Sequence, residues 1–342
     1  MGMSVLVTGG YFDEGADGVV HHVELDTGHV ATWARWRPPE HLAVPRKGLT
    51  GAQRNDTHLY CAAHAAVVRW NLRSARVDGV LHQPDFNDLH DLALGDQELL
   101  IVNTGCDAVE RFRLDGTFVA RHTWQPGWVQ ARRIQGEDLD NFDSVCRVDW
   151  TGEAPHWSSR TNADDYHSHP GERPHLSFAR ARVVDRVHPN HVVCVAGEWL
   201  VTCLYDGSLR SLGSMTTRLT IPGHPHDGVL AEDGLWFTTI DGGVWRAPRP
   251  IGQVPAVRVA EAFSPGRVGW CRGLLVTPEY LIVGLTEVRH GRLPKHHWAD
   301  ANPEDSVTGL VVLDRHTHAQ QRFIDLTDRA RHHKIYSIVE VV

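Results

Sequence analysis

Histidine content is the first chemical feature of this chain. Histidine makes up 24 of the 342 residues, a share well above that of an ordinary globular protein. Imidazole serves proteins as a general acid or base, as a nucleophile and as the commonest metal ligand. We therefore begin with the positions at which histidines recur.

Three histidines recur near the start of short apolar segments. They are His90 in "LHDLAL", His191 in "PNHVV" and His226 in "PHDGVL". Aligned as copies of one repeat, the three fall in one phase, so we expect their side chains to meet around a common axis. Three neutral imidazoles suit a divalent iron, manganese, zinc or copper ion and leave coordination positions open for a substrate. The pattern predicts a catalytic metal site.

Two aspartates directly follow these histidines. Asp91 and Asp227 are candidates to accept the second ring N–H of a metal-bound histidine. Neighbours in a strand point to opposite faces, however, so each aspartate could instead cap a turn or pair with an adjacent part of the fold. His188 and His224, shortly before the aligned positions, are alternative ligands if the phase of the repeat differs.

The same alignment brings other polar residues to the axis. Two arginines, Arg54 and Arg272, are predicted to bind a carboxylate, sulfate or phosphate, or to stabilise an oxyanion. The alternative for each arginine is a salt bridge between neighbouring repeats. Without a metal, the histidines would hydrogen-bond to one another and to ordered water. The remaining ring positions are Gln53, Cys271, and Tyr336 or Ser337.

Short β-strands are the elements that must position these residues. Runs of β-branched and aliphatic residues bounded by Gly, Asp, Asn and Pro recur along the chain, whereas helical periodicity is rare. The expected strands include residues 4–8, 19–24, 58–62, 67–70, 99–103, 109–114, 199–204, 235–239, 281–284 and 308–313.

The strands group into an internal repeat. Five copies begin at Ala52, Leu89, Asn190, Pro225 and Trp270, and a sixth is split between "KIYSIVEVV" at the C-terminus and "SVLVTGG" with "GVVHHVELDTG" at the N-terminus. A repeat of this kind is typical of a β-propeller blade of four strands. We predict an all-β, six-bladed β-propeller, a single domain over residues 1–342 closed by strands from both termini, with five or seven blades as alternatives. Its inner strands would line a central channel.

Two stretches break the repeat. Residues 125–187 lie between blades three and four, and residues 289–306 interrupt the last blade; both are too long for simple connections. Both carry histidines and are predicted to cover the active face. In the first stretch, His167, His169 and His175 would either add a ligand or only cover the site.

The composition limits the kinds of binding partner that we expect for this protein. The formal charge is −8, from 34 basic and 42 acidic residues, and no long basic run offers a site for nucleic acid or an anionic membrane. No apolar run of eighteen residues and no signal-peptide pattern occurs, so we predict a cytoplasmic protein with a small-molecule substrate. The six cysteines contain no C-x-x-C pair and are predicted to be reduced.

Parts of the sequence resemble known propellers. "PHDGVLAEDGLWFTTIDGGVWR" resembles a blade of the streptogramin (virginiamycin B) lyase group. The series "LHDLAL", "HPNHVV", "GHPHDG" and "WCRGLLV" is similar to an uncharacterised bacterial propeller family over residues 85–342. A further likeness is to bacterial arylsulfate sulfotransferases, six-bladed propellers with channel histidines and an arginine. The positions matching that family are His90, His191, His226 and Arg272.

The leading functional expectation is a metal-dependent enzyme. It would act on a small polar or anionic metabolite at the channel mouth, and the resemblance favours lyase or hydrolase chemistry. Alternatives are a non-haem iron oxygenase at the same site, a transferase in which a histidine attacks a sulfuryl or phosphoryl donor, and a non-enzymatic interaction scaffold. The scaffold alternative predicts an exposed apolar patch.

Overall fold

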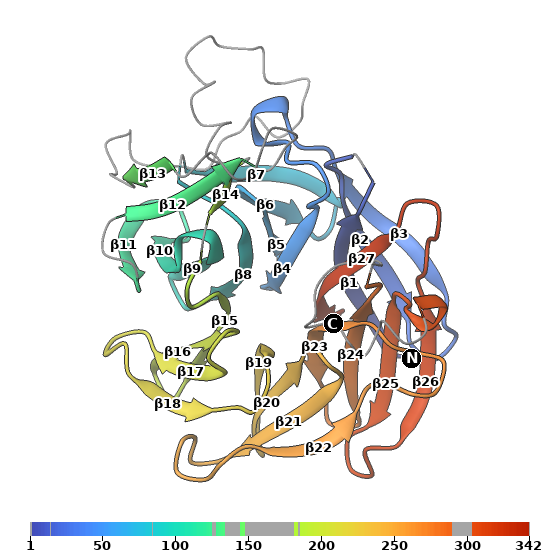
Figure 1. The fold of residues 1–342 in the computed structure, drawn as a ribbon. Coiled ribbons are helices and arrows are strands. Elements are labelled where there is room, and N and C mark those ends of the chain that lie inside the picture. Colours follow the sequence, from blue (N-terminus) through green and yellow to red (C-terminus); the bar gives the residue numbers. More distant parts are fainter. Residues whose placement is uncertain are drawn as a thin grey trace.

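Six four-stranded antiparallel sheets form a ring around a central axis (Figure 1). The computed structural model describes residues 2–13, 15–83, 85–124, 128–133, 144–147, 181–183, 185–288 and 303–341. The inner strand of each sheet packs against the inner strands of the two neighbouring sheets, so the ring is closed. The predicted all-β, six-bladed propeller is confirmed.

The first three blades are built from the N-terminal part of the chain and its C-terminal strand. From the axis outward, blade 1 contains β27 (His333–Glu340), β1 (Ser4–Tyr11), β2 (Gly18–Glu24) and β3 (Val30–Trp36). Blade 2 contains β4 (Leu49–Arg54), β5 (His58–Ala63), β6 (Ala66–Asn71) and β7 (Arg76–His82). Blade 3 contains β8 (Leu89–Leu94), β9 (Glu98–Asn103), β10 (Ala108–Arg113) and β11 (Phe118–Thr123).

The remaining blades follow the same order. Blade 4 contains β15 (Pro189–Val195), β16 (Glu198–Cys203), β17 (Ser208–Ser211) and β18 (Thr217–Thr220). Blade 5 contains β19 (Pro225–Ala231), β20 (Gly234–Thr239), β21 (Gly243–Pro248) and β22 (Val257–Glu261). Blade 6 contains β23 (Trp270–Val276), β24 (Tyr280–Thr286), β25 (Gly309–Asp314) and β26 (Gln320–Asp325). Short 3₁₀ turns are η1 (Glu40–Leu42), η2 (Thr104–Cys106) and η5 (Pro303–Asp305).

Strands from both termini close the ring, as predicted. The C-terminal strand β27 pairs antiparallel with β1, with Val7 opposite Ile338 and Thr8 opposite Ser337. The inner wall of blade 1 therefore comes from the last residues of the chain and the rest of the blade from the first. Closure in this way leaves no free inner edge between the first and last blades.

The hydrophobic core is divided into layers between adjacent blades. Trp70 belongs to the layer between blades 1 and 2, and Trp236 to the layer between blades 5 and 6; both are almost completely buried. Trp199 and Trp245 are partly buried against the layers on either side of blade 4. These four tryptophans pack between neighbouring blades.

Hydroxyl groups of one blade hydrogen-bond to the inner strand of the next blade. Thr8 donates to the carbonyl oxygen of Thr50 at 2.7 Å, and Thr50 donates to that of Leu89 at 2.6 Å. Thr104 donates to the carbonyl oxygen of Pro189 at 2.6 Å. These buried hydrogen bonds tie each blade to the inner strand of the next, so they fix the channel walls.

The long insertion contributes a sheet of its own. Its three described strands are β12 (Trp128–Arg133), β13 (Ser144–Arg147) and β14 (Ala181–Val183), in the order β13-β12-β14. Most of residues 125–187, including His167, His169 and His175, lie outside the described residues, so the prediction that this stretch covers the active face stays a prediction. The same holds for residues 289–302 of the second insertion.

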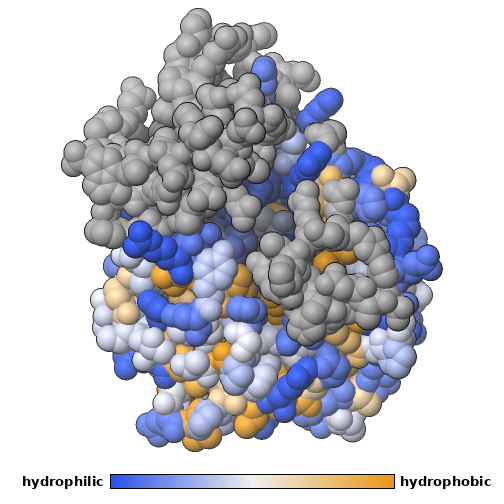
Figure 2. Space-filling model, in the orientation of Figure 1, coloured by the Kyte–Doolittle hydropathy of each residue, from blue (hydrophilic) through white to orange (hydrophobic). Residues whose placement is uncertain are grey.

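The surface of the described residues is mixed in polarity. Hydrophobic and polar residues are interspersed over the face in Figure 2, and the large exposed hydrophobic residues are scattered: Val119, Tyr205, Val254, Val257 and Val341. The structure gives five cysteines as free thiols: Cys61, Cys106, Cys194, Cys203 and Cys271. No helix among the described residues is long and apolar enough to cross a membrane.

A buried histidine pair in blade 1 predicts acid sensitivity. His21 and His333 pack edge to face, with ring centroids 4.9 Å apart. Burial lowers the pKa of each to about 4, helped by Arg35 for His21 and by His21 for His333. Both folded-state pKa values lie below the ordinary value near 6.5, so protons bind the unfolded chain first, and stability is lost as pH falls from about 6.5 towards 4.

We expect the free energy of unfolding to fall by about 2 kcal/mol or more between pH 7 and pH 5. Urea unfolding at several pH values checks this. His21→Gln removes one of the two groups and should flatten the pH dependence. An identical slope in wild type and variant would contradict the assignment.

Candidate functional site

Every inner strand is irregular near its beginning. One or two residues lie unpaired between the strand and its partner, a β-bulge that bends the strand and changes the direction of its side chains. Six bulges at one level of the ring aim a set of side chains at the axis. In five inner strands the pairing with the second strand of the blade shifts between these residues: Leu49/Ala52, Leu89/Asp91, Pro189/His191, His226/Val229 and Cys271/Leu274. In blade 1, Thr8 and Gly9 of β1 pair with Ser337 and Ile335, so Tyr336 of β27 is left between them.

The first residue of each inner strand decides which place along that strand each histidine takes. His90 and His226 are both the second residue of their inner strands. In β15 the second residue is Asn190, and His191 is third, the place that Asp91 holds in β8. The prediction of one phase for three histidines is therefore wrong for His191, because β15 begins at Pro189, one residue before the predicted copy, and the sequence alone does not mark where each inner strand begins.

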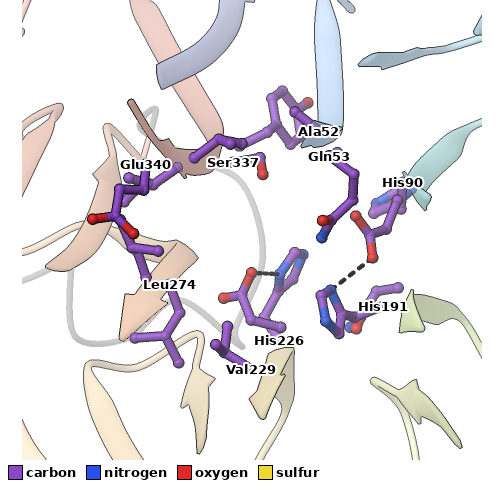
Figure 3. A pocket seen from close by; sticks show the side chains of 17 residues that line it. Ala52, Gln53, His90, His191, His226, Val229, Leu274, Ser337 and Glu340 are labelled. Carbon is purple, nitrogen blue, oxygen red and sulfur yellow. Dashed lines mark ion pairs between the residues drawn. The ribbon is translucent and has the colours of Figure 1, made fainter. Parts of the chain in front are cut away.

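A pocket of about 190 Å³ lies in the channel at this level. Figure 3 shows His90, His191 and His226 on successive inner strands around the hollow, with Gln53 beside His90 and with Leu274 and Glu340 on the opposite side. The structure thus brings together most of the predicted ring. The predicted ring residues that line the pocket are Gln53, His90, His191, His226, Tyr336 and Ser337.

Three residues of the predicted ring do not line the pocket: Arg54, Cys271 and Arg272. Cys271 is fully buried in the hydrophobic layer between blades 5 and 6. Arg54 is the half-buried last residue of β4 and does not line the pocket, so its predicted catalytic role has no structural support. Arg272 contacts the wall from behind, since its guanidinium carbon lies 4.4 Å from the ring centroid of Tyr336 and 5.0 Å from that of Trp270.

His191 links three blades. Its Nδ1 lies 2.7 Å from the Asp91 carboxylate of blade 3, and its Nε2 donates to the carbonyl oxygen of Gly228 in blade 5 at 3.0 Å. A carbonyl and a carboxylate both accept, so both ring nitrogens carry protons and His191 is an imidazolium. Burial lowers its pKa, but Asp91 outweighs burial and the net shift is upward. In this arrangement neither nitrogen has a lone pair for a metal ion.

The two aspartates also connect blades. Besides His191, Asp91 accepts from the backbone N–H of Val192 at 3.2 Å. Asp227 accepts from the backbone N–H of Gly273 in blade 6 at 3.1 Å and from the Thr238 hydroxyl at 2.7 Å. The sequence left open whether each aspartate supports the preceding histidine or pairs with an adjacent part of the fold. Both aspartates pair across blades. Asp227 also lies 3.5 Å from His226 Nδ1.

His90, His188 and His226 gather at the end of the channel where the inner strands begin. The ring centroid of His90 is 4.8 Å from that of His188 and 6.3 Å from that of His226. Burial lowers the pKa of His90 to about 3, with His188 and His226 adding to the effect against Asp88. Burial likewise lowers the pKa of His226. These two imidazoles are neutral at physiological pH.

A cationic cluster faces the histidines across the channel; we use the name for Lys47, Arg272 and Lys334. Lys334 is 1% exposed, and its ammonium group donates to the carbonyl oxygen of Arg46. Lys47 pairs with Asp88 at 2.9 Å. The Nε of Arg272 is buried with no hydrogen-bond partner among the described residues. A buried donor without an acceptor next to an ammonium group is an arrangement that a bound anion would satisfy.

Tyr336 is the pocket residue that the cationic cluster surrounds. Burial raises the pKa of its phenol, but Lys334, Arg272 and Lys47 outweigh burial and lower it to about 8. The pKa of Lys334 is also lowered to about 8, chiefly by burial, and Tyr336 opposes that shift. Near neutral pH the phenol and the ammonium group therefore compete for protons. Sequence reasoning offered Tyr336 only as an alternative ring residue and did not single out Lys334. The other two cations that act on Tyr336, Arg272 and Lys47, come from elsewhere in the ring, where the sequence does not show them to be close.

The predicted metal site does not assemble as the sequence suggested. Among the described residues, no group of three or more His, Cys, Asp or Glu side chains is arranged to hold a metal ion. His191 is engaged at both of its ring nitrogens. The set of His90, His191 and His226 therefore stays a prediction that this arrangement does not favour.

Comparison with known proteins supports the fold alone. No family model matches the sequence, and no curated protein matches it significantly. A crystal structure of a protein of unknown function from Bacteroides caccae is similar with a TM-score of 0.58 and 11% identity, covering 100% of this chain and 99% of that one. A nidogen/laminin complex contains a chain with a TM-score of 0.55 and 8% identity, covering 99% and 98%. The chain is thus similar in fold to uncharacterised bacterial propellers.

Proposed function

We propose that the central channel is the active site of an enzyme that removes a proton from a small anionic metabolite. The observation that carries the proposal is the convergence of Lys47, Arg272 and Lys334 on the Tyr336 phenol in the pocket wall. Lyase chemistry is the reaction class that the likeness to the streptogramin lyase group favours. The volume of about 190 Å³ suits a molecule of metabolite size rather than a polymer.

The roles follow from charge and position. The cationic cluster would hold the carboxylate of the substrate, with the unpaired Arg272 Nε as one donor. Tyr336, as a phenolate, would take the proton from the carbon next to that carboxylate. The electron pair of the broken C–H bond would form a C=C bond as a leaving group departs from the neighbouring carbon with its own bonding pair. The new phenol would then return its proton to the leaving group.

The neutral histidines would orient the substrate. The Nδ1–H of His90 donates to the carbonyl oxygen of Asp88 at 2.9 Å, which leaves the Nε2 lone pair as an acceptor. His226 also lines the pocket and is neutral because burial lowers its pKa. Acceptors on this side and cations on the other would fix a substrate that carries both hydroxyl groups and a carboxylate.

Deuterium exchange tests the proposed proton transfer. Malate, tartrate and aspartate are incubated in D₂O with the enzyme, and exchange at carbon is followed by NMR together with loss of the leaving group. We expect Tyr336→Phe to slow exchange by about 100-fold or more, and Tyr280→Phe, outside the channel, to have no effect. Binding of none of these acids, or exchange unchanged in Tyr336→Phe, would contradict the proposal.

Near-ultraviolet titration provides a readout that needs no substrate. Wild type should show one phenolate forming near pH 8 that is missing in Tyr336→Phe. Arg272→Gln should move this midpoint upward, since it removes one of the cations that lower the pKa.

A second candidate is transfer of a sulfuryl group by a histidine. His226 is neutral, faces the pocket and lies near enough to Arg272 for that charge to lower its pKa. Its ring nitrogen would attack the sulfur of an aryl sulfate while the phenolate leaves. A covalent adduct on His226 after incubation with 4-nitrophenyl sulfate, seen by intact mass, would favour this function over proton abstraction.

A further inference from the structure

Five successive blades each contribute an uncharged polar side chain to the channel pocket. From blade 1 to blade 5 these side chains are Ser337, Gln53, His90, Asn190 and His226. The two histidines are neutral because burial lowers the pKa of each. Every member of the set can therefore form hydrogen bonds without carrying a charge. We call these five residues the polar wall.

The fold leaves much of the hydrogen-bonding capacity of the polar wall unused. The Gln53 amide and the Ser337 hydroxyl make no hydrogen bond to any described residue. Asn190 donates from Nδ2 to the carbonyl oxygen of Pro225 at 2.9 Å, but its Oδ1 is buried without a partner among the described residues, as is Nδ1 of His226. Buried polar groups are normally paired, so several unpaired groups around one pocket indicate a missing ligand.

Two members of the polar wall show what this ligand must supply. The Nδ1–H of His90 donates to the carbonyl oxygen of Asp88 at 2.9 Å, so its Nε2 is an acceptor. Asn190 uses its amide nitrogen on Pro225, so its free atom is also an acceptor. A carboxylate only accepts and would satisfy neither. A hydroxyl group both donates and accepts, so hydroxyl groups could pair with these acceptors and with Gln53 and Ser337 alike.

The remaining part of the pocket wall is apolar. It includes Val229, Leu274 and Leu275, and Figure 3 shows Val229 and Leu274 on the side away from His90 and Gln53. Aliphatic side chains favour contact with C–H groups, because that contact removes apolar surface from water. The carbon skeleton of a sugar carries hydroxyl groups together with C–H bonds, so it suits both walls of this pocket.

We propose that the ligand of the channel is a polyhydroxylated carboxylic acid, which is the chemistry of a sugar acid. This inference rests on the proposed function, in which the cationic cluster holds the carboxylate of the substrate. The polar wall would bind the hydroxyl groups, and the leucines would pack against the C–H bonds. Gln53 is then a residue that determines specificity, since its amide has no bond within the described fold and is free to bind a hydroxyl group.

A series of ligands tests this class on the unaltered full-length protein. Calorimetry measures binding of D-gluconate, D-galactonate, D-glucuronate and D-galacturonate, with hexanoate and sorbitol as matched comparisons. Hexanoate has the carboxylate without hydroxyl groups, and sorbitol has hydroxyl groups without the carboxylate. We expect at least one of the four sugar acids to bind, and both comparison compounds to bind about 100-fold or more weakly, because each leaves polar groups of the site unpaired.

Leucine in place of Gln53 tests the polar wall directly. Gln53→Leu keeps a side chain of similar size and removes an amide that makes no hydrogen bond to the described residues, so the variant should fold. Affinity for the sugar acid that binds wild type most tightly should fall about tenfold, the effect of losing one hydrogen bond, with no loss of affinity for hexanoate. Gln320→Leu, exposed on the outermost strand of blade 6, is the matched control and should bind as wild type does.

The outcomes separate this inference from the proposed function. Binding of none of the four sugar acids, hexanoate binding as tightly as they do, or an unchanged affinity in Gln53→Leu would overturn the ligand class. Binding of a sugar acid without deuterium exchange at its carbons would contradict proton removal by Tyr336 and leave the ligand class standing. Exchange of malate without binding of any sugar acid would have the opposite meaning.

Discussion

Alanine in place of Gly51 is expected to lower the free energy of unfolding by about 3 kcal/mol or more. Gly51 lies where inner strand β4 meets inner strand β8. An added Cβ would be 2.4 Å from both the Cα and the Oδ1 of Asp91, and 2.7 Å from the carbonyl oxygen of His90. Two of these three contacts are with backbone atoms, which cannot move aside as a flexible side chain would. The blades must separate or the bulge must shift.

The effect of Gly51→Ala should extend to the pocket. Displacing Asp91 weakens its contact with His191, and displacing the backbone of His90 moves an imidazole of the pocket wall. Urea unfolding measures the stability. Gly213→Ala is the matched control, because a Cβ there meets nothing within 4 Å; it should change stability by less than about 0.5 kcal/mol. Similar stabilities for the two variants would show that the blades are not packed this closely.

Removal of the Asp91 carboxylate should be comparably costly. Asp91→Ala leaves the His191 side chain, only 12% exposed, without its counter-charge and the Val192 N–H without an acceptor. Breaking a buried ion pair by deleting one partner costs about 3–5 kcal/mol. Asp78→Ala is the control, because Asp78 pairs with Arg69 and His58 at a side chain that is 34% exposed, and such pairs contribute about 1 kcal/mol or less.

The pH dependence of the Asp91 variant has a definite sign. The folded-state pKa of His191 is raised above 6.5, so the contribution of the pair is fully present below about pH 6.5 and is lost as pH rises through the folded-state pKa. The difference in stability between wild type and Asp91→Ala should therefore be largest in mildly acidic solution and shrink in alkali. A difference that grows with pH would contradict an imidazolium at His191.

The sequence by itself determined the architecture. Short alternating strands in a repeated order, with the sixth copy divided between the ends, predicted the six blades and their closure by β27 and β1. Such predictions succeed because strand patterns are local and a propeller repeats them. The repeat also indicated the level of the channel at which His90, His226 and Tyr336 lie, since equivalent positions of a ring must converge.

Only the tertiary structure decided what each channel residue does. The local sequence does not mark the first residue of an inner strand. Because β15 begins at Pro189, one residue before the predicted copy, His191 shares its place with Asp91 and not with His90. The protonation states of the channel residues also depend on the closed ring. The cations around Tyr336 come from three blades, and the oxygens that hold His188 and His191 come from residues far along the chain. Protonation and hydrogen bonding depend on distances across the ring, so they are fixed only when the ring has closed.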